Sequence, residues 1–207
     1  MAGQKYKLLT LERFCDIFCV NKIFEVRTVL IRNFFLHLGT VLKHKWHVFK
    51  LCVRAGIPWR GLVHDLSKFS YTEFWESVKY FQGNRSPIVM CKQEEGYSKA
   101  WLHHKGRNKH HYQYWNDYEA PDATPVMPYK YTVEMICDTL AAGIVYKGKN
   151  WTNSSQLEYW NKSKVKAKIN PKLVNLLDEV YTQVANQGLK KTINRKNLRE
   201  LYKKHCE

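Results

Sequence analysis

Residues 62–69, Leu-Val-His-Asp-Leu-Ser-Lys-Phe, place a histidine beside a carboxylate in an apolar segment, with a lysine three positions further on. Histidine and carboxylate side chains are common ligands of divalent transition metals. We expect this segment to be a short helix, in which neighbouring side chains point about 100° apart. His64 and Asp65 could therefore share a metal only at the edge between them, and other residues must complete the site.

The flanking N-terminal sequence predicts helices. Residues 10–20 form a short amphipathic segment that opens with a threonine cap, and residues 23–55 carry a longer helical pattern that we expect to break or bend near Gly39. Ser70 and Glu73 form a capping box that begins the next helix, which should run to about residue 82. A loop is expected from there to residue 95.

The C-terminal half is also helical in pattern. Residues 96–105 and 108–117 should be two helical pieces separated near Gly106, and three prolines exclude a regular helix from residues 120–128. Further helices are expected at residues 130–147, 171–187 and 194–205. No segment alternates as a strand does, so the sequence predicts an all-α fold.

Composition limits the class of protein. The 207 residues fit one domain, 1–207, and their 44% hydrophobic content argues against disorder. No CxxC pair suggests a zinc ribbon, and Cys15 and Cys19, which share a helical face, are expected to be buried reduced thiols. No apolar run is long enough to span a bilayer, and no secretion signal is visible, so we expect a cytoplasmic protein.

The charge indicates an anionic partner. Thirty-four Lys and Arg against eighteen Asp and Glu give a formal net charge of +16. Such an excess attracts nucleotides, nucleic acid or an anionic membrane, although part of it could serve solubility alone.

Helical position separates two histidine candidates upstream of the His-Asp pair. Seven of the nine histidines fall between residues 44 and 111. His44 shares a face with Val41 and Val48, whereas His47 shares a face with lysines. We therefore expect His44 to point inward, and His47 to face solvent or an anionic substrate.

Asp138 is the candidate downstream of the pair. It lies within the apolar run 135–142, and burying an unpaired carboxylate there would be costly. An arginine partner is the alternative explanation, but none lies within a helical turn. A metal-ligand role is the favoured reading.

Four histidines gather between residues 103 and 111, and aromatic residues follow them. The aromatic residues suit a buried face, so at least one histidine of each pair should point inward. Two other readings stay open: surface or hydrogen-bonded histidines, and a basic-aromatic patch that stacks nucleic-acid bases. The four are His103, His104, His110 and His111.

The order His44, His64-Asp65, Asp138 resembles the H…HD…D pattern of the HD-domain superfamily of metal-dependent phosphohydrolases, and Lys68 completes His-Asp-x-x-Lys. More narrowly, residues 64–69, 108–115 and 127–138 resemble an uncharacterised bacterial and phage family, the DUF5662 proteins. That resemblance covers roughly residues 35–185. It implies an HD-like core at about 35–150 with helical extensions, the C-terminal one at about 151–207.

The resemblance also implies metal ligands. The first ion would take His44, His64, Asp65 and Asp138. A second ion, or a substrate phosphate, would take His104, His110 and His111. His104 is preferred to His103 because the family has a histidine four residues before the asparagine, here Asn108. The Gly-Tyr-Pro motif of the cyclic-dinucleotide phosphodiesterases is absent, so that specificity is not implied.

The function that follows is hydrolysis of a phosphate ester, in a nucleotide-like or other anionic substrate, by a metal-activated water. Asp65 would bridge two divalent ions, and Lys68 would stabilise or protonate the departing group. Manganese, iron, nickel, cobalt, zinc and magnesium are not distinguished. The alternatives are an HD-type di-iron oxygenase and a non-catalytic basic protein that binds nucleic acid. The expected substrate-binding residues are Lys105, Arg107, Asn108, Lys109 and His47.

Overall fold

One long helix, α1 (Ala2–Arg54), stands where the sequence predicted two separate segments. This computed structural model describes the backbone of residues 2–207 and the side chains of residues 25–207. The helix passes through Thr10 and Gly39 without a break, which corrects the expected cap and interruption. A glycine inside a helix costs only about 1 kcal/mol, and the buried His37 and Val41 hold α1 to the body on either side of Gly39. The thiols of Cys15 and Cys19 lie outside the described side chains.

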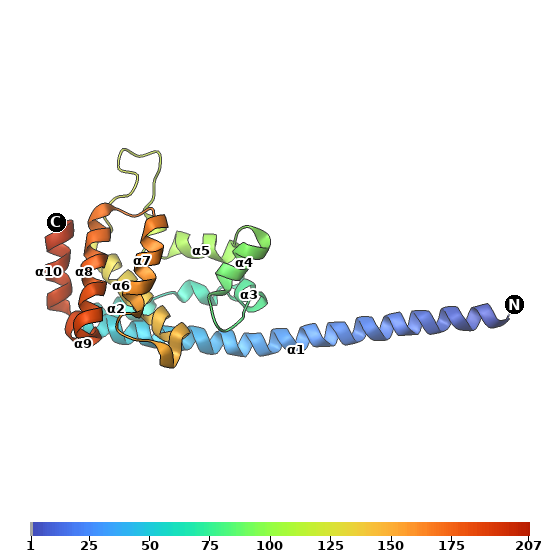
Figure 1. The fold of residues 1–207 in the computed structure, drawn as a ribbon. Helices are drawn as coiled ribbons and strands as arrows, with labels where there is room; N and C mark the ends of the chain where they lie inside the picture. Colours follow the sequence, from blue (N-terminus) through green and yellow to red (C-terminus); the bar gives the residue numbers. More distant parts are fainter. Residues whose placement is uncertain (1) are drawn as a thin grey trace.

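The remaining elements are also helical, and residues 2–207 contain no strand, as the sequence predicted. In Figure 1 the C-terminal helices pack against one end of α1, while its other end extends away from them. The α-helices are α2 (Pro58–Val63), α3 (Tyr71–Lys79), α4 (Pro87–Glu95), α5 (Lys99–Arg107), α6 (Tyr129–Lys147), α7 (Ser155–Ser163), α8 (Pro171–Gln187), α9 (Leu189–Thr192) and α10 (Arg195–Cys206), and the 3₁₀ turns are η1 (Leu66–Phe69), η2 (Tyr112–Tyr114), η3 (Gly148–Asn150) and η4 (Lys164–Lys166).

The main core forms where α1, α6, α8 and α10 meet. Val48 on α1, Leu140 on α6, Leu176 on α8 and Leu198 on α10 are each at most 1% exposed. Burying an aliphatic side chain of this size contributes about 1.5–3 kcal/mol. This packing fixes α6 against α1, which are the two helices that carry Asp138 and His44.

Two local predictions were wrong. The expected loop before residue 96 contains α4, because Pro87 occupies the first helical turn, where its missing N–H costs nothing. Gly106 lies inside α5, and the expected helix at 108–117 is reduced to η2. There the Trp115 indole donates to the Lys109 carbonyl oxygen at 2.7 Å, which supports an irregular backbone instead of a helix.

No helix among the residues that the structure describes is long and apolar enough to cross a membrane.

Candidate metal centre

His64 and Asp65 lie in the turn between α2 and η1, not in the helix that the sequence predicted. His64 ends α2 with an extended ψ of 129°. Asp65 then adopts a φ of 52°, in the left-handed region. It is the only non-glycine residue in the described backbone with a positive φ. Aspartate tolerates this conformation better than most residues do. The turn therefore lets the two neighbouring side chains face a common space.

The turn is fixed against α1 by close packing and by a lysine. A Cβ atom at Gly61 would lie 2.7 Å from Cys52 Cβ and 3.0 Å from Phe49 Cα, so only glycine allows α2 to approach α1 this closely. Lys45 Nζ donates to the carbonyl oxygens of His64 and, at 3.4 Å, Leu62. These contacts hold the His-Asp turn beside His44.

The first group of candidate ligands joins α1, the turn and α6. His44 Nε2 lies 3.0 Å from Asp138 Oδ1, and His64 Nε2 lies 3.5 Å from the same oxygen. His64 Nε2 is also 3.3 Å from Asp65 Oδ2. One ligand atom from each of these four residues falls within 4.8 Å of all the others, so together they could hold a metal ion.

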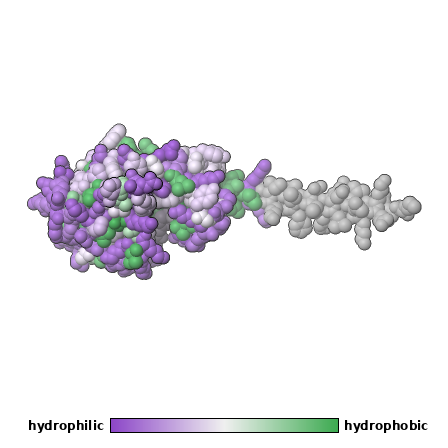
Figure 2. All heavy atoms as spheres, turned by 90° about the horizontal axis from the view of Figure 1, so that it is seen from above, coloured by the Kyte–Doolittle hydropathy of each residue, from purple (hydrophilic) through white to green (hydrophobic). Residues whose placement is uncertain are grey.

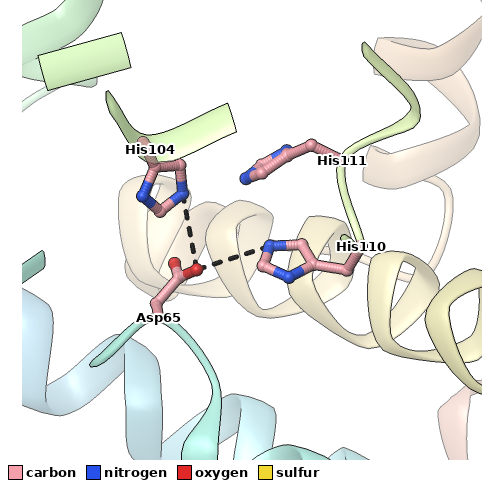
Figure 3. A group of neighbouring side chains, drawn as sticks. All are labelled: Asp65, His104, His110 and His111. Carbon is pink, nitrogen blue, oxygen red and sulfur yellow. Dashed lines mark ion pairs between the residues drawn. The ribbon is translucent and has the colours of Figure 1, made fainter. Parts of the chain in front are cut away.

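The second group joins the turn to the end of α5 and the loop that follows it. Asp65 Oδ1 lies 3.4 Å from Nε2 of both His104 and His110, and Figure 3 shows His111 pointing into the same space. These four residues could also hold an ion. The two oxygens of Asp65 therefore face different histidines, Oδ2 toward the first group and Oδ1 toward the second.

Orphaned buried atoms test whether a metal suits these residues. Seven nitrogen and oxygen atoms have no partner with hydrogen-bond geometry, although Lys68 Nζ lies 2.7 Å from Asp65 Oδ2 and other charged atoms lie 3.0–3.7 Å from their neighbours. Buried polar atoms without partners are costly, and a cation would satisfy the Nε2 atoms and the carboxylate oxygens together. The donor set of imidazole nitrogens and carboxylate oxygens fits a divalent ion. The atoms are His44 Nε2, His64 Nε2, Asp65 Oδ1 and Oδ2, His110 Nδ1 and Nε2, and His111 Nε2.

The electrostatics of the centre favour ionised carboxylates. Burial alone would raise the pKa of Asp65, but His64 and Lys68 lower it well below its usual range. The same balance holds for Asp138, where the adjacent imidazoles of His44 and His64 outweigh burial and hold the pKa well below its usual range. Burial and the charge of Lys68 lower the pKa of His44, which favours the neutral imidazole that metals bind.

Glu134 on α6 is a functional candidate that sequence reasoning missed. Its side chain is fully buried, with Oε1 3.1 Å from His64 Nδ1 and 3.3 Å from His110 Nδ1. Arg60 approaches Oε2 at 2.7 Å through both Nε and Nη2. Burial raises the pKa of Glu134, but these partners lower it to about 2. A carboxylate on Nδ1 leaves Nε2 free for a metal, so Glu134 can orient one histidine of each group.

Glu134 could itself join His64 and His110 around an ion, because one ligand atom from each of the three lies within 4.8 Å of the other two. The contacts with Nδ1 and the Arg60 pair favour an orienting role. The sequence held a usable signal: Glu134 lies one turn before Asp138 in the same apolar helix, so the argument that selected Asp138 applies to it.

Glu73 on α3 is the second missed residue. Its carboxylate lies 2.6 Å from His103 Nδ1 and 2.7 Å from His104 Nδ1. Ser70 Oγ does accept from the Glu73 amide at 3.4 Å, but the Glu73 side chain does not return to the Ser70 amide, which donates to Ser67 instead. The capping box is therefore half formed, because its carboxylate holds the histidines.

A comparison with known families covers the part of the chain that contains these groups. A family model described as "Family of unknown function (DUF5662)" matches residues 33–183. The chain belongs to the DUF5662 family. The matched range contains every residue of both groups and both orienting glutamates. No curated protein and no solved structure matches the chain.

The residues expected to bind substrate in this DUF5662 protein differ in whether their side chains contact the two groups. Asn108 is engaged, since its Nδ2 donates to Ser67 Oγ at 2.7 Å and to the His104 carbonyl oxygen at 2.9 Å. Lys109 lies 5.6 Å from the Tyr114 ring centroid. No described ion pair or hydrogen bond joins the side chains of Lys105, Arg107, Lys109 or His47 to the two groups, and their role stays a prediction.

The candidate metal centre is open to solvent on the side where Lys68 lies. Its Nζ lies 2.7 Å from Asp65 Oδ2, and its side chain is 28% exposed. Asp138 is 14% exposed, whereas the side chains of His64 and Asp65 are at most 1% exposed. Tyr146, two turns beyond Asp138 on α6, interacts electrostatically with both Lys68 and Asp138. A substrate would reach the ligands from this side.

Proposed function

We propose that this DUF5662 protein is a metal-dependent phosphohydrolase of the HD type, with two divalent ions bound by the two groups. The observation that carries the proposal is the orientation of Asp65, whose two oxygens face separate sets of histidines. A carboxylate in that position suits a shared ligand of a two-metal site. The expected domain span 1–207, with a core at about 35–150, stays part of this proposal.

Bound divalent ions would lower the pKa of a water and polarise a phosphoryl oxygen. The chain's own residues would prepare the site for that chemistry. The orienting glutamates hold three imidazoles with Nε2 toward Asp65: Glu134 acts on His64 and His110, and Glu73 acts on His104. These contacts fix the tautomers before substrate binds.

Lys68 is the residue best placed to act on the substrate. Its ammonium contacts Asp65 and faces the open side, where a phosphoryl oxygen would approach. A fixed cation there would stabilise negative charge that develops as the phosphate ester breaks. The formal charge of +16 would raise the local concentration of anionic substrates, of which nucleotides are one class.

The ligand set also supports a second reaction class. Five histidines accompany two carboxylates in the two groups, and a histidine-rich set also suits two irons. Some members of the HD superfamily are di-iron oxygenases, so this remains the alternative function.

A hydrolysis panel tests the proposal. Protein stripped with a chelator would be reloaded with manganese, nickel, cobalt, zinc, magnesium or ferrous iron, and assayed on phosphomonoesters and phosphodiesters including nucleotides. We expect metal-dependent cleavage of a phosphate ester, with inorganic phosphate as the product from a monoester and a monoester as the product from a diester, and we expect Asp138→Ala to abolish it. Asp117→Ala is the matched control, because this aspartate is exposed and lies outside both groups.

Three results would count against hydrolysis. A di-iron protein with a charge-transfer band and no phosphatase activity would favour oxygenation. Metal-free protein that binds nucleic acid as tightly as metal-loaded protein, with no turnover, would favour the basic binding protein. Equal hydrolysis by wild type and Asp138→Ala would show that the activity arises elsewhere.

A further inference from the structure

Exposed apolar side chains are concentrated on one part of the described chain. Of 22 exposed large hydrophobic residues, 14 lie between Val26 and Trp75, which is far more than an even distribution would give. Figure 2 shows hydrophobic side chains on the described part of α1 next to the residues drawn in grey, while the body in that view is mostly hydrophilic. Large exposed apolar patches mark interaction sites.

On α1, apart from Val26, Val29 and Leu36, five of these residues form one continuous face. They recur at steps of four and seven residues, so at 100° per residue they lie within about 60° of one another. The buried residues His37, Val41 and Val48 occupy the roughly opposite side of the helix, against the body. α1 therefore has two apolar faces, of which only one is covered by the described chain. We call the second the outer face: Ile31, Phe35, Leu42, Trp46 and Val53.

Neighbouring segments extend the outer face. Phe34, next to Phe35, lies 5.8 Å from the exposed Trp75 of α3, measured between ring centroids. Further along α1, α2 packs tightly on it through Gly61, and its Trp59 and Leu62 are also exposed. Exposed apolar side chains thus also lie on α2 and α3, the two helices that flank this part of α1.

A strip of cations runs beside the outer face. Residues 25–54 hold six Lys and Arg and a single acid, Glu25. Lys50 Nζ lies 5.5 Å from the Trp46 ring centroid, so the strip directly adjoins the apolar residues. Around the axis of α1, the cations of the strip lie about 40–140° from the residues of the outer face. They are the exposed residues Arg32, Lys43, Lys50 and Arg54.

This arrangement restricts what can cover the outer face. A second copy of the chain would bring the same cationic strip close to its own, and like charges beside a helical interface are destabilising. A nucleic acid would match the charge, but it offers no apolar partner for Ile31, Leu42 and Val53. An anionic lipid surface satisfies both: its headgroups pair with the cations, and its acyl boundary takes the apolar side chains.

We propose that the outer face of α1 docks the protein on an anionic lipid bilayer. The helix lies in the plane of the surface, with Phe35 and Trp46 inserted at the level of the headgroups. Lys43 and Lys50 extend to the lipid phosphates, as long cationic side chains do at membrane interfaces. The proposal does not depend on the metal centre, because His44 and its partners lie on the opposite side of α1.

Vesicle flotation with the full chain tests the proposal. The probes are vesicles of phosphatidylcholine alone and vesicles that also contain phosphatidylserine, at low and high salt. We expect binding only to the anionic vesicles, with weakening by salt. Phe35→Ser combined with Trp46→Ser should reduce partitioning by roughly tenfold or more. Adding Lys43→Glu and Lys50→Glu to that variant should reduce its partitioning further, since each cation near an anionic surface contributes about fivefold to binding.

The matched control is Tyr159→Ser combined with Val165→Ser. These side chains are 63% and 84% exposed but lie on α7 and η4, away from the outer face, so binding should not change. Circular dichroism verifies that every variant keeps its helix content. Equal binding to neutral and anionic vesicles, no binding at all, or wild-type binding by the Phe35/Trp46 variant would overturn the proposal. So would a dimer, found by sedimentation, that this variant dissociates in the absence of vesicles.

Discussion

The substitution Glu134→Gln tests whether Glu134 orients histidines of both groups or is an ordinary buried side chain. The substitution keeps the shape of residue 134 but removes its charge. It affects Oε1, which faces Nδ1 of His64 and His110, and Oε2, which pairs with Arg60. Because His64 belongs to the first group and His110 to the second, one change should weaken both candidate metal sites.

The size of the effect follows from these contacts. A hydrogen bond to a charged group contributes about 1.5–3 kcal/mol, and one between neutral groups about 1 kcal/mol. The loss at each histidine is therefore about 0.5–2 kcal/mol, or roughly two- to thirtyfold in metal affinity. Loss of an outer partner of a metal ligand typically costs about 10- to 100-fold, which overlaps that range.

Glu73→Gln is the matched comparison. Glu73 contacts His103 and His104 and so reaches the second group only. Stripped wild-type and variant proteins would be titrated with zinc or manganese in competition with a fluorescent chelator. We expect two binding steps in wild type, both weakened by Glu134→Gln and a single one weakened by Glu73→Gln. The thermal unfolding of the metal-free variants serves as the control for folding.

Three outcomes would refute the reasoning. If Glu134→Gln left both affinities unchanged, the contacts with Nδ1 would not position the imidazoles. If it affected the same single step as Glu73→Gln, Glu134 would not link the two groups. If it removed one ion entirely and left the other untouched, Glu134 would be a direct ligand in the group with His64 and His110.

Two further predictions concern Lys68 and His37. Lys68→Ala should lower kcat by about 10²-fold or more, as the loss of a group that stabilises transition-state charge does, while the metal content stays at the wild-type value by elemental analysis. An unchanged kcat would remove Lys68 from the mechanism. Burial and the charge of Lys68 lower the pKa of His37 to about 4, so between pH 6.5 and 4 the unfolded chain binds more protons than the folded one. Stability should therefore fall as the pH falls, by about 2 kcal/mol at pH 5 from this residue. His37→Phe, which keeps a ring between Phe74 and Phe81, should lose that much less between pH 7 and pH 5 in urea unfolding of the metal-free protein. Equal losses in the two proteins would assign the acid sensitivity to other groups.

Helical periodicity was a good guide wherever one face of a helix is buried. It placed His44 inward and His47 outward, and in the structure His44 approaches Asp138 while His47 remains partly exposed. It also located α8, where Asn170 caps the helix by accepting from the Lys172 amide at 2.9 Å. These features depend only on residues that are close together in the sequence, so the sequence of one chain is enough to predict them.

The turn at Asp65 could not be predicted in this way. Its left-handed backbone depends on tertiary packing: Gly61 lies against α1, and Lys45 holds the His64 carbonyl oxygen. Contacts between residues that lie far apart in the sequence cannot be predicted from a local sequence pattern. Glu73 was missed for a related reason, because its position in a capping box explained it locally while its side chain turned to His103 and His104.

The metal content of the purified protein tests the central claim most directly. Protein made without a metal-capturing tag would be analysed for bound elements alongside Asp65→Ala, with circular dichroism to compare helix content. We expect two divalent ions per chain in wild type. In Asp65→Ala we expect neither ion and nearly unchanged helix content, because Asp65 faces both groups. Wild type without metal even after reloading, or Asp65→Ala with a full complement, would contradict the assignment of the centre.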